Sequence, residues 1–213
     1  MKKILTSFGF DTHSELLQLS IPSLYNYATK HGYDLFIPSK EYFSPETKTR
    51  HYSWWKIELI TKLFNSYDRI LWIDADMAIC DTSKDVFDDF EDNSHIGMVV
   101  HEGSEGSVPN CGLWLLDKKC LEWFDDLWQY NNFRCSNGWW EQAAMIYKLG
   151  IDPDHRPIKL PLEYPIPWTQ LDYRWNPHIW DPRGIPSDMR FFHSTMMHDK
   201  VRVTKTILAK YGF

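Results

Sequence analysis

The segment that most constrains the fold is Arg69-Ile-Leu-Trp-Ile-Asp74-Ala-Asp76, an apolar run that ends abruptly in two carboxylates. Four consecutive apolar residues predict a strand over residues 69–73 that is buried on both of its faces. Such strands are typical of mainly parallel sheets covered by helices, in which ligands bind beyond the carboxyl ends of the strands. We therefore expect Asp74 and Asp76 to lie at the ligand-binding edge of an α/β sheet.

Strand and helix patterns alternate along the chain on either side of this segment. Further strands are predicted over residues 3–8, 35–37, 96–101, 112–116 and 191–193. Helices are predicted over residues 14–30, 53–65, 120–130, 140–149 and 200–211, the first interrupted near Pro22 with Ser20 as a new N-cap. The proline-rich residues 153–186 predict an ordered irregular segment. The 213 residues thus predict a single α/β domain, with helices on both faces of a mainly parallel sheet.

Composition and charge exclude some classes of partner. The chain has 29 acidic and 23 basic residues, and its net charge of -6 does not attract nucleic-acid backbones. No apolar stretch approaches the length of a membrane span, and the apolar run near the N-terminus is too short for a secretory signal. The four cysteines lack C-x-x-C spacing and predict free thiols in a reducing compartment. We expect a cytoplasmic protein that does not bind nucleic acid.

The two aspartates at the end of the apolar run can bind one metal ion together. In extended backbone, side chains at i and i+2 project to the same side, so Asp74 and Asp76 can share a ligand. Two carboxylates this close repel each other unless a cation neutralises them, and oxygen ligands suit Mg²⁺ or Mn²⁺. His193, at the tip of a later strand, can add a nitrogen ligand that favours Mn²⁺, and His198 competes for that role.

Two further motifs place polar side chains beside predicted elements. Gly112 would let the backbone approach a ligand closely before a buried strand, and Asn110 offers a donor and an acceptor to sugar hydroxyls. Glu141 and Gln142 open a helix, whose dipole alone favours an acidic residue there. In the functional interpretation both face a reacting sugar, where they bind hydroxyls or stabilise positive charge at the anomeric carbon.

Taken together, these motifs resemble the GT-A glycosyltransferases, most closely the retaining family of fungal α-galactosyltransferases and plant xyloglucan xylosyltransferases. The matching motifs, in the family's order, are Trp54-Trp-Lys56-Ile, Trp72-Ile-Asp74-Ala-Asp76, Asn110-Cys-Gly112 followed by Trp123 and Trp128, Glu141-Gln142-Ala-Ala-Met, and Phe192-His193. The family usually carries a glycine soon after the late histidine, whereas Ser194, Thr195 and two methionines follow here. The short chain is also similar to the glycosyltransferase domain that chloroviruses encode for capsid glycosylation.

The resemblance implies a GT-A (Rossmann-like) fold and the retaining transfer of a hexosyl or related residue from a UDP-sugar to a glycan or glycoprotein. Residues 1–105 would bind the nucleotide and residues 106–213 the acceptor. The implied metal ligands for Mn²⁺ or Mg²⁺ are Asp74, Asp76 and His193, and the implied catalytic residues are Asp74, Glu141 and Gln142. The implied donor-binding residues are Thr6, Ser7, Phe8, Lys56, Asp74, Ala75, Asp76, Asn110, Gly112 and Lys200. A viral member would work in the host cytoplasm.

Retention of configuration implies either front-face attack, which we favour, or a covalent intermediate on Glu141. Two other classes of protein fit part of the pattern. A metal-dependent nucleotidyltransferase acting on sugar phosphates would use the same aspartates, but Thr6-Ser-Phe-Gly-Phe-Asp11 contains no basic residue for a phosphate loop. A non-catalytic sugar-binding module would not need the metal motif. It would explain the aromatic side chains, whose candidates for stacking on an acceptor sugar are Trp139, Trp140, Trp168 and Trp175.

Overall fold

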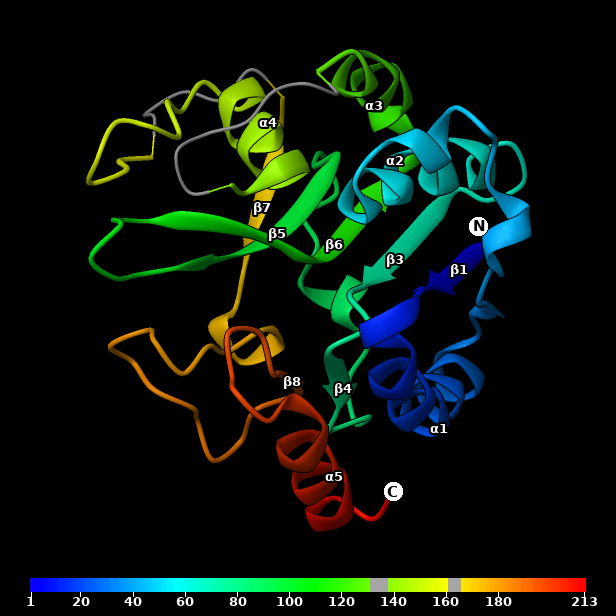
Figure 1. Ribbon diagram of the computed structural model, residues 1–213, viewed down its shortest axis with the longest axis vertical. Coiled ribbons are helices and arrows are strands. Elements are labelled where there is room, and N and C mark those ends of the chain that lie inside the picture. Colours follow the sequence, from blue (N-terminus) through cyan, green and yellow to red (C-terminus); the bar gives the residue numbers. More distant parts are fainter. Residues whose placement is uncertain (131–137, 161–165) are drawn as a thin grey trace.

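The computed structural model describes residues 1–130, 138–160 and 166–213 and has a six-stranded central sheet (Figure 1). The strands of this sheet, in spatial order, are β2 (Asp34–Phe36), β1 (Lys3–Thr6), β3 (Arg69–Ile73), β6 (Val108–Asp117), β5 (Ile96–His101) and β7 (Trp168–Leu171). Five of them run in the same direction, because β6 alone pairs antiparallel with both of its neighbours. The predicted α/β class with a mainly parallel sheet is confirmed.

The central strand β3 explains why the sheet is covered on both faces. Its residues alternate between two apolar clusters, with Ile70 and Trp72 on one face and Leu71 and Ile73 on the other. The helices α2 (Tyr52–Leu63), α3 (Leu121–Trp128) and α4 (Trp140–Lys148) lie on the first side, and α1 (Ser14–His31) and α5 (Lys200–Lys210) on the second (Figure 1). Each fully buried large apolar side chain, such as that of Leu71, stabilises the fold by roughly 1.5–3 kcal/mol.

A second, two-stranded sheet positions the late histidine. It pairs β4 (Met77–Ile79) antiparallel with β8 (Phe191–His193), and its register places Met77 opposite His193. The backbone N–H of Ser194 donates to the carbonyl oxygen of Asp76 over 2.9 Å, which extends the pairing by one step. The sequence analysis predicted β8 but not β4, although β4 is the element that brings His193 beside the two aspartates.

Two expectations about secondary structure are wrong. Helix α1 is continuous from Ser14 to His31 and carries Pro22 in its interior, so Ser20 is a buried helical residue and not an N-cap. Proline removes one helical hydrogen bond, but Leu17, Leu24 and other apolar side chains on the same helix pack against the sheet and keep it in one piece. In the segment that was predicted to be irregular, β7 forms and pairs parallel with β5.

The described cysteines Cys80, Cys111 and Cys120 are buried free thiols, and burial raises the pKa of Cys80 to about 12. The fourth, Cys135, lies outside the described residues. No helix in the described ranges is both long enough and apolar enough to span a bilayer.

Candidate active site

Asp74 follows directly after β3 and is held from three directions. Its Oδ1 atom accepts hydrogen bonds from Trp72 Nε1 at 2.7 Å and from Lys56 Nζ at 3.2 Å. Its backbone N–H donates to the carbonyl oxygen of Gly112 on β6 over 2.8 Å. Lys56 comes from α2 and Gly112 from the neighbouring strand, so three elements fix the position of this carboxylate.

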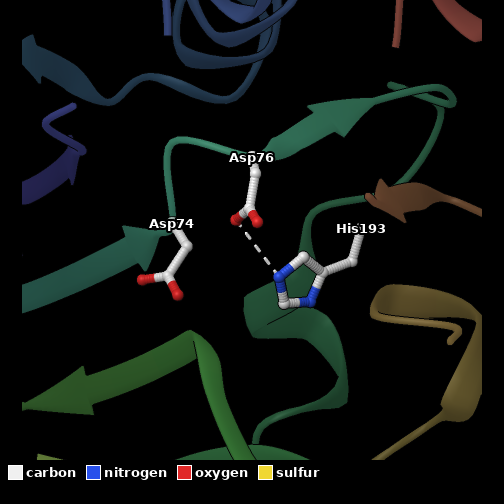
Figure 2. Close-up of side chains that lie close together, drawn as sticks. All are labelled: Asp74, Asp76 and His193. Atoms are coloured by element: carbon white, nitrogen blue, oxygen red, sulfur yellow. Dashed lines mark ion pairs between the residues drawn. The ribbon is translucent and has the colours of Figure 1, made fainter. Parts of the chain in front are cut away.

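Asp76 is buried, with 6% of its surface exposed, and has two cationic or potentially cationic neighbours. Lys200 Nζ lies 2.6 Å from Oδ2 of Asp76. His193 Nε2 lies 3.2 Å from its Oδ1, and Figure 2 shows this ion pair as a dashed line. Burial by itself would raise the pKa of Asp76, but His193 and Lys200 reverse the effect and hold that pKa well below its ordinary range. Asp76 is therefore ionised at neutral pH despite its burial.

Asp74, Asp76 and His193 come together as the sequence analysis predicted. Each offers one ligand atom, and these atoms lie within 4.8 Å of one another (Figure 2). His193 Nδ1 contacts the side-chain oxygen Oδ1 of buried Asn176 at 3.0 Å. An amide oxygen can only accept, so Nδ1 carries a hydrogen, and Nε2, which faces Asp76, is the nitrogen that could bind a cation. This donor set fits Mn²⁺ or Mg²⁺. His198 is exposed and lies outside the group.

A network of amide side chains holds His193 in place, and it involves Gly112 in a way that the sequence did not predict. Asn110 Oδ1 accepts from the backbone N–H of Gly112 at 2.9 Å and from Asn176 Nδ2 at 2.8 Å. A Cβ atom on Gly112 would lie 2.6 Å from Cε1 of His193. Glycine is required here because the imidazole ring occupies the space that a side chain would need.

Lys56 and Glu141 form a buried ion pair behind Asp74. Their side chains are 4% and 6% exposed, and Lys56 Nζ lies 2.8 Å from Glu141 Oε1 and 3.1 Å from the carbonyl oxygen of Cys111. Burial disfavours the charge of Lys56, but Asp74 and Glu141 outweigh it and raise the lysine pKa. Burial likewise raises the pKa of Glu141, and Lys56 offsets part of that rise. Lys56 thus braces both carboxylates.

These charged groups line a first cavity of about 420 Å³ at the ends of β1 and β3. Among its lining residues are Phe8, Lys56, Asp74, Ala75, Asp76, Asn110, Gly112, Glu141, Gln142, His193 and Lys200, all of which were singled out from the sequence. Gln142 Oε1 accepts from the backbone N–H of Cys111 at 3.1 Å, so its amide nitrogen is left as a donor for a ligand. The cavity draws residues from both halves of the chain.

The expected role of Thr6 and Ser7 in this cavity is wrong. Both are fully buried, and Thr6 Oγ1 donates to the carbonyl oxygen of Phe36 on β2. The chain enters the cavity only from Phe8 onward, because the residues before it are still enclosed by the sheet. The cavity is also lined by the residues just beyond the first predicted strand, where the strand-end rule expects a ligand although none was named individually as a site residue: Gly9, Phe10, Asp11, Thr12 and His13. Phe8 and Phe10 stack with ring centroids 5.2 Å apart.

A second cavity of about 840 Å³ adjoins the first and shares Ser53, Asn110, Glu141, Gln142 and Thr195 with it. Two of the four tryptophans proposed for stacking, Trp139 and Trp140, line it. The other two do not, because Trp168 belongs to β7 and is 9% exposed, and Trp175 is completely buried. Trp180 was not singled out from the sequence, yet it lines the second cavity and is 63% exposed.

Comparisons with known proteins agree with this fold. A sequence model of the galactosyl transferase GMA12/MNN10 family matches residues 4–102. The structure is similar to a glycosyltransferase involved in the glycosylation of the major capsid of PBCV-1, with a TM-score of 0.70, 19% identity, and coverage of 97% of this chain and 100% of that one. A search of curated proteins finds no match.

Two further structural neighbours extend the comparison. The glycosyltransferase GlyE of Streptococcus pneumoniae TIGR4 gives a TM-score of 0.63 at 14% identity over 97% of this chain and 60% of that one. The galactosyltransferase LgtC, solved with donor and acceptor sugar analogues, gives 0.57 at 10% identity over 100% of this chain and 97% of that one. The fold is that of the GT-A glycosyltransferases. Together with the family match, it indicates that this protein is a glycosyltransferase.

Proposed function

We propose that this glycosyltransferase moves a hexosyl or related residue from a UDP-sugar to a glycan, free or on a glycoprotein, with the help of Mn²⁺ or Mg²⁺. The observation that carries the proposal is the convergence of Asp74, Asp76 and His193 at the first cavity, with their ligand atoms within 4.8 Å of one another. Oxygen and imidazole ligands at such a distance suit a divalent cation that also binds a diphosphate.

The two cavities suggest where each substrate binds. We place the nucleotide sugar in the first cavity, where Lys200 and the metal ligands can neutralise a diphosphate, and the acceptor in the second. The shared wall of Glu141, Gln142 and Asn110 would then face the transferred sugar. LgtC, of the same fold, was solved with donor and acceptor analogues, which supports a two-substrate arrangement. In this division residues 1–105 contribute mainly to the nucleotide side and residues 106–213 to the acceptor side.

The chain's own residues would prepare the site before the donor binds. Asn176 orients His193, and Lys56 holds the Asp74 carboxylate in place. Lys200 stands 2.6 Å from Asp76 and can move to a phosphate oxygen when a cation takes over the carboxylate. A bound divalent metal would offset the negative charge that builds on the departing nucleoside diphosphate. Gln142 would hydrogen-bond a hydroxyl of the donor sugar through its amide nitrogen.

We further propose retention by front-face attack. The alternative, a covalent intermediate, would need a carboxylate nucleophile, and Glu141 is already tied to Lys56 at 2.8 Å in a buried pair. Glu141→Gln tests this choice, since loss of an essential nucleophile lowers kcat by orders of magnitude. We expect the variant to keep most of its kcat although its thermal stability falls. The anomeric configuration of the product, followed by NMR, tests retention itself.

The first experiment is calorimetric titration of the wild type and Asp76→Asn with UDP, each with and without Mn²⁺. We expect UDP binding to the wild type to depend on Mn²⁺ and to be lost in the variant. Asp92→Asn is the matched control, because Asp92 is an exposed aspartate outside both cavities. Binding that survives in Asp76→Asn would contradict the metal site. Binding of GDP in place of UDP would contradict the proposed donor and leave the metal site intact.

A likeness to the PBCV-1 capsid glycosyltransferase supports a glycoprotein as the natural acceptor. Transfer is tested by incubating the protein with UDP-glucose, UDP-galactose and UDP-xylose in turn and measuring UDP release. Release that rises when a sugar acceptor is added would identify transfer, and release without any acceptor would identify hydrolysis of the donor.

A further inference from the structure

The second cavity differs from the first in the charge of its walls. Four carboxylates line it, from Glu102, Glu105, Glu141 and Asp181, and its described lining includes no lysine or arginine. The first cavity, by contrast, contains Lys56 and Lys200. Three of these carboxylates are already paired with cations behind the wall: Glu141 with Lys56, Glu105 with Arg156 and Asp181 with Arg183. Glu102 is the one for which the described residues supply no ion pair, so its charge disfavours a negatively charged ligand while its oxygens can accept hydrogen bonds from hydroxyl groups.

Trp180 is presented to this cavity by a loop that is firmly attached to the sheet. The carboxylate of Asp181 accepts from the backbone N–H of Glu102 at 2.8 Å, and Arg183 donates to the carbonyl oxygen of Val100 at 2.7 Å. The Tyr173 hydroxyl accepts a hydrogen bond from the backbone N–H of His178 at 2.8 Å. The same hydroxyl donates to the backbone carbonyl oxygen of His178 at 2.9 Å. Trp180 is 63% exposed although its loop is fixed by these hydrogen bonds. Because the loop is already ordered, a partner that binds the indole loses little free energy to ordering the loop.

The histidine two residues before Trp180 offers a hydrogen bond to the same cavity. The backbone N–H of Trp180 donates to His178 Nδ1 at 3.2 Å. Because Nδ1 accepts that bond, the ring hydrogen must be on Nε2, which has no hydrogen-bond partner among the described residues. His178 therefore presents an N–H donor to the cavity that Trp180 also lines.

Met196 adds an apolar side chain to the same cavity under backbone strain. Its φ of 59° lies in the left-handed region, which disfavours every residue with a branched or long side chain relative to glycine. Its side chain is 69% exposed, so packing in the core does not explain why methionine occupies this position. Residues in strained backbone conformations cluster at binding sites, where the surrounding structure keeps them in a conformation that serves binding.

We propose that the second cavity binds a neutral pyranose of the acceptor, with the apolar face of the sugar on Trp180 and a sugar hydroxyl oxygen accepting the Nε2–H of His178. Met196 covers the apolar edge of the ring, and the Glu102 carboxylate accepts from another hydroxyl. The arrangement excludes uronic acids and phosphorylated sugars by charge. The inference rests on the proposed function and names the acceptor class for it.

The test compares acceptors that differ in one group. Octyl glycosides of glucose, galactose, xylose and rhamnose are offered with the matched octyl glucuronide, and the rate of transfer is measured with the donor at saturation. We expect at least one neutral glycoside to have a KM about tenfold or more below that of the glucuronide. In Glu102→Gln, which removes a negative charge from the cavity, we expect these two KM values to lie closer together. Equal or better use of the glucuronide, or transfer to none of the neutral glycosides, would overturn the proposal.

Variants locate the subsite. Trp180→Ala is expected to raise the KM of the preferred glycoside about tenfold, Trp180→Phe less, and His178→Ala about tenfold, all with kcat nearly unchanged. Tyr25→Ala is the control, because Tyr25 is an exposed aromatic on α1 outside both cavities. An unchanged KM in Trp180→Ala would overturn the inference.

UDP titration of each variant separates this inference from the proposed function. If Trp180→Ala binds UDP and hydrolyses the donor as the wild type does, a rise in acceptor KM belongs to the second cavity. A wild type that neither binds nor hydrolyses any UDP-sugar would overturn the proposed function and, with it, this assignment.

Discussion

The two cavities of this protein share a wall but are built in different ways. The first lies at the tips of β1 and β3, and its shape depends on buried charges that neutralise one another, above all Lys56 with Glu141 and Lys200 with Asp76. The second is lined mostly by loop residues, which are held by hydrogen bonds to backbone groups and leave Trp180 and Met196 exposed. One cavity is organised by charge and the other by backbone attachment.

This difference matches what each cavity has to bind. A diphosphate with a metal ion needs fixed charges, and side chains that have been desolvated in advance interact with it strongly. An uncharged sugar ring offers hydroxyls and an apolar face, so it needs aromatic side chains and hydrogen-bond partners but no cation. Loss of a buried cation or a metal ligand in the first cavity should therefore affect folding or donor binding, while loss of the exposed Trp180 or Met196 side chain in the second should affect mainly acceptor binding.

The largest effect is expected for Lys56→Met. The change leaves the buried Glu141 carboxylate without its cation, so it should lower the free energy of unfolding by about 3–5 kcal/mol and abolish transfer. Urea unfolding at neutral pH measures the loss. The matched control is Lys62→Met on the same helix, whose ion pair with Glu58 is 40% exposed at the lysine and should cost about 0.5 kcal/mol or less. Equal losses for the two lysines would show that the buried pair is not what organises the first cavity.

The second prediction concerns the orientation of His193. Asn176→Ala removes the acceptor at 3.0 Å from Nδ1 and should weaken Mn²⁺ binding about 10–100-fold, since a metal-binding histidine depends on the partner of its other nitrogen. Titration with Mn²⁺ in the presence of UDP measures the affinity, and Asn93→Ala, at an exposed position outside both cavities, is the control. Unchanged affinity would mean that His193 does not need this support or does not bind the metal.

The third prediction concerns the attachment of the second cavity. Burial would raise the pKa of Asp181, but the Arg183 guanidinium and the backbone N–H of Glu102 outweigh it and lower that pKa below the ordinary 3.8. Asp181→Asn should therefore lower the free energy of unfolding at neutral pH by about 1–3 kcal/mol, through weaker hydrogen bonds. UDP binding in the first cavity should not change.

The pH dependence follows from the sign of that shift. A carboxylate whose pKa is depressed in the folded state stabilises the protein above its unfolded pKa, and the stabilisation is lost as the pH falls through the folded value. The difference between wild type and Asp181→Asn should therefore be constant near neutrality and shrink below the ordinary value of 3.8. Urea unfolding of both proteins at a series of acidic pH values checks this. A difference that grows on acidification would contradict the assignment.

The smallest effect is expected for Met196→Gly. Loss of the side chain should raise the acceptor KM about threefold, while relief of the left-handed backbone at φ 59° should keep Tm at or above the wild-type value. Met196→Ala is the matched control, since it removes the same contact and keeps the strain. The two variants should share one KM and differ in Tm, and a wild-type KM in both would exclude Met196 from the subsite.

Several residues of the site could be predicted because they depend on local geometry. Asp74 and Asp76 follow an apolar strand, and His193 ends another, so the rule that ligands bind at the carboxyl ends of strands brought them together correctly. Thr6 and Ser7 were assigned from the family resemblance and do not line the cavity, because both are fully buried and the chain enters the cavity only at Phe8. The strand-end rule points beyond the first predicted strand, where the lining residues lie, whereas the resemblance assigned two residues that are still enclosed.

Other parts of the site had no sequence signal. Asn176 lies in a segment without periodicity, and its bond to His193 joins residues that are 17 positions apart. Which tryptophan side chains reach the second cavity depends on whether distant segments of the chain cover them. Trp175 is completely buried, whereas Trp180, five residues later, is exposed. Gly112 was expected to let the backbone approach a ligand, and the group that lies against it in the structure is the ring of His193.

The sequence by itself determined the period of the strands and helices, the α/β class and the placement of two carboxylates after a buried strand, because each depends on neighbours within a few residues. Only the tertiary structure decided that β4 would pair with β8, that Lys56 would neutralise Glu141, and that the second cavity would have no cation among its described lining residues. Those outcomes depend on which distant segments exclude water from a side chain, and burial of this kind is a property of the packed molecule.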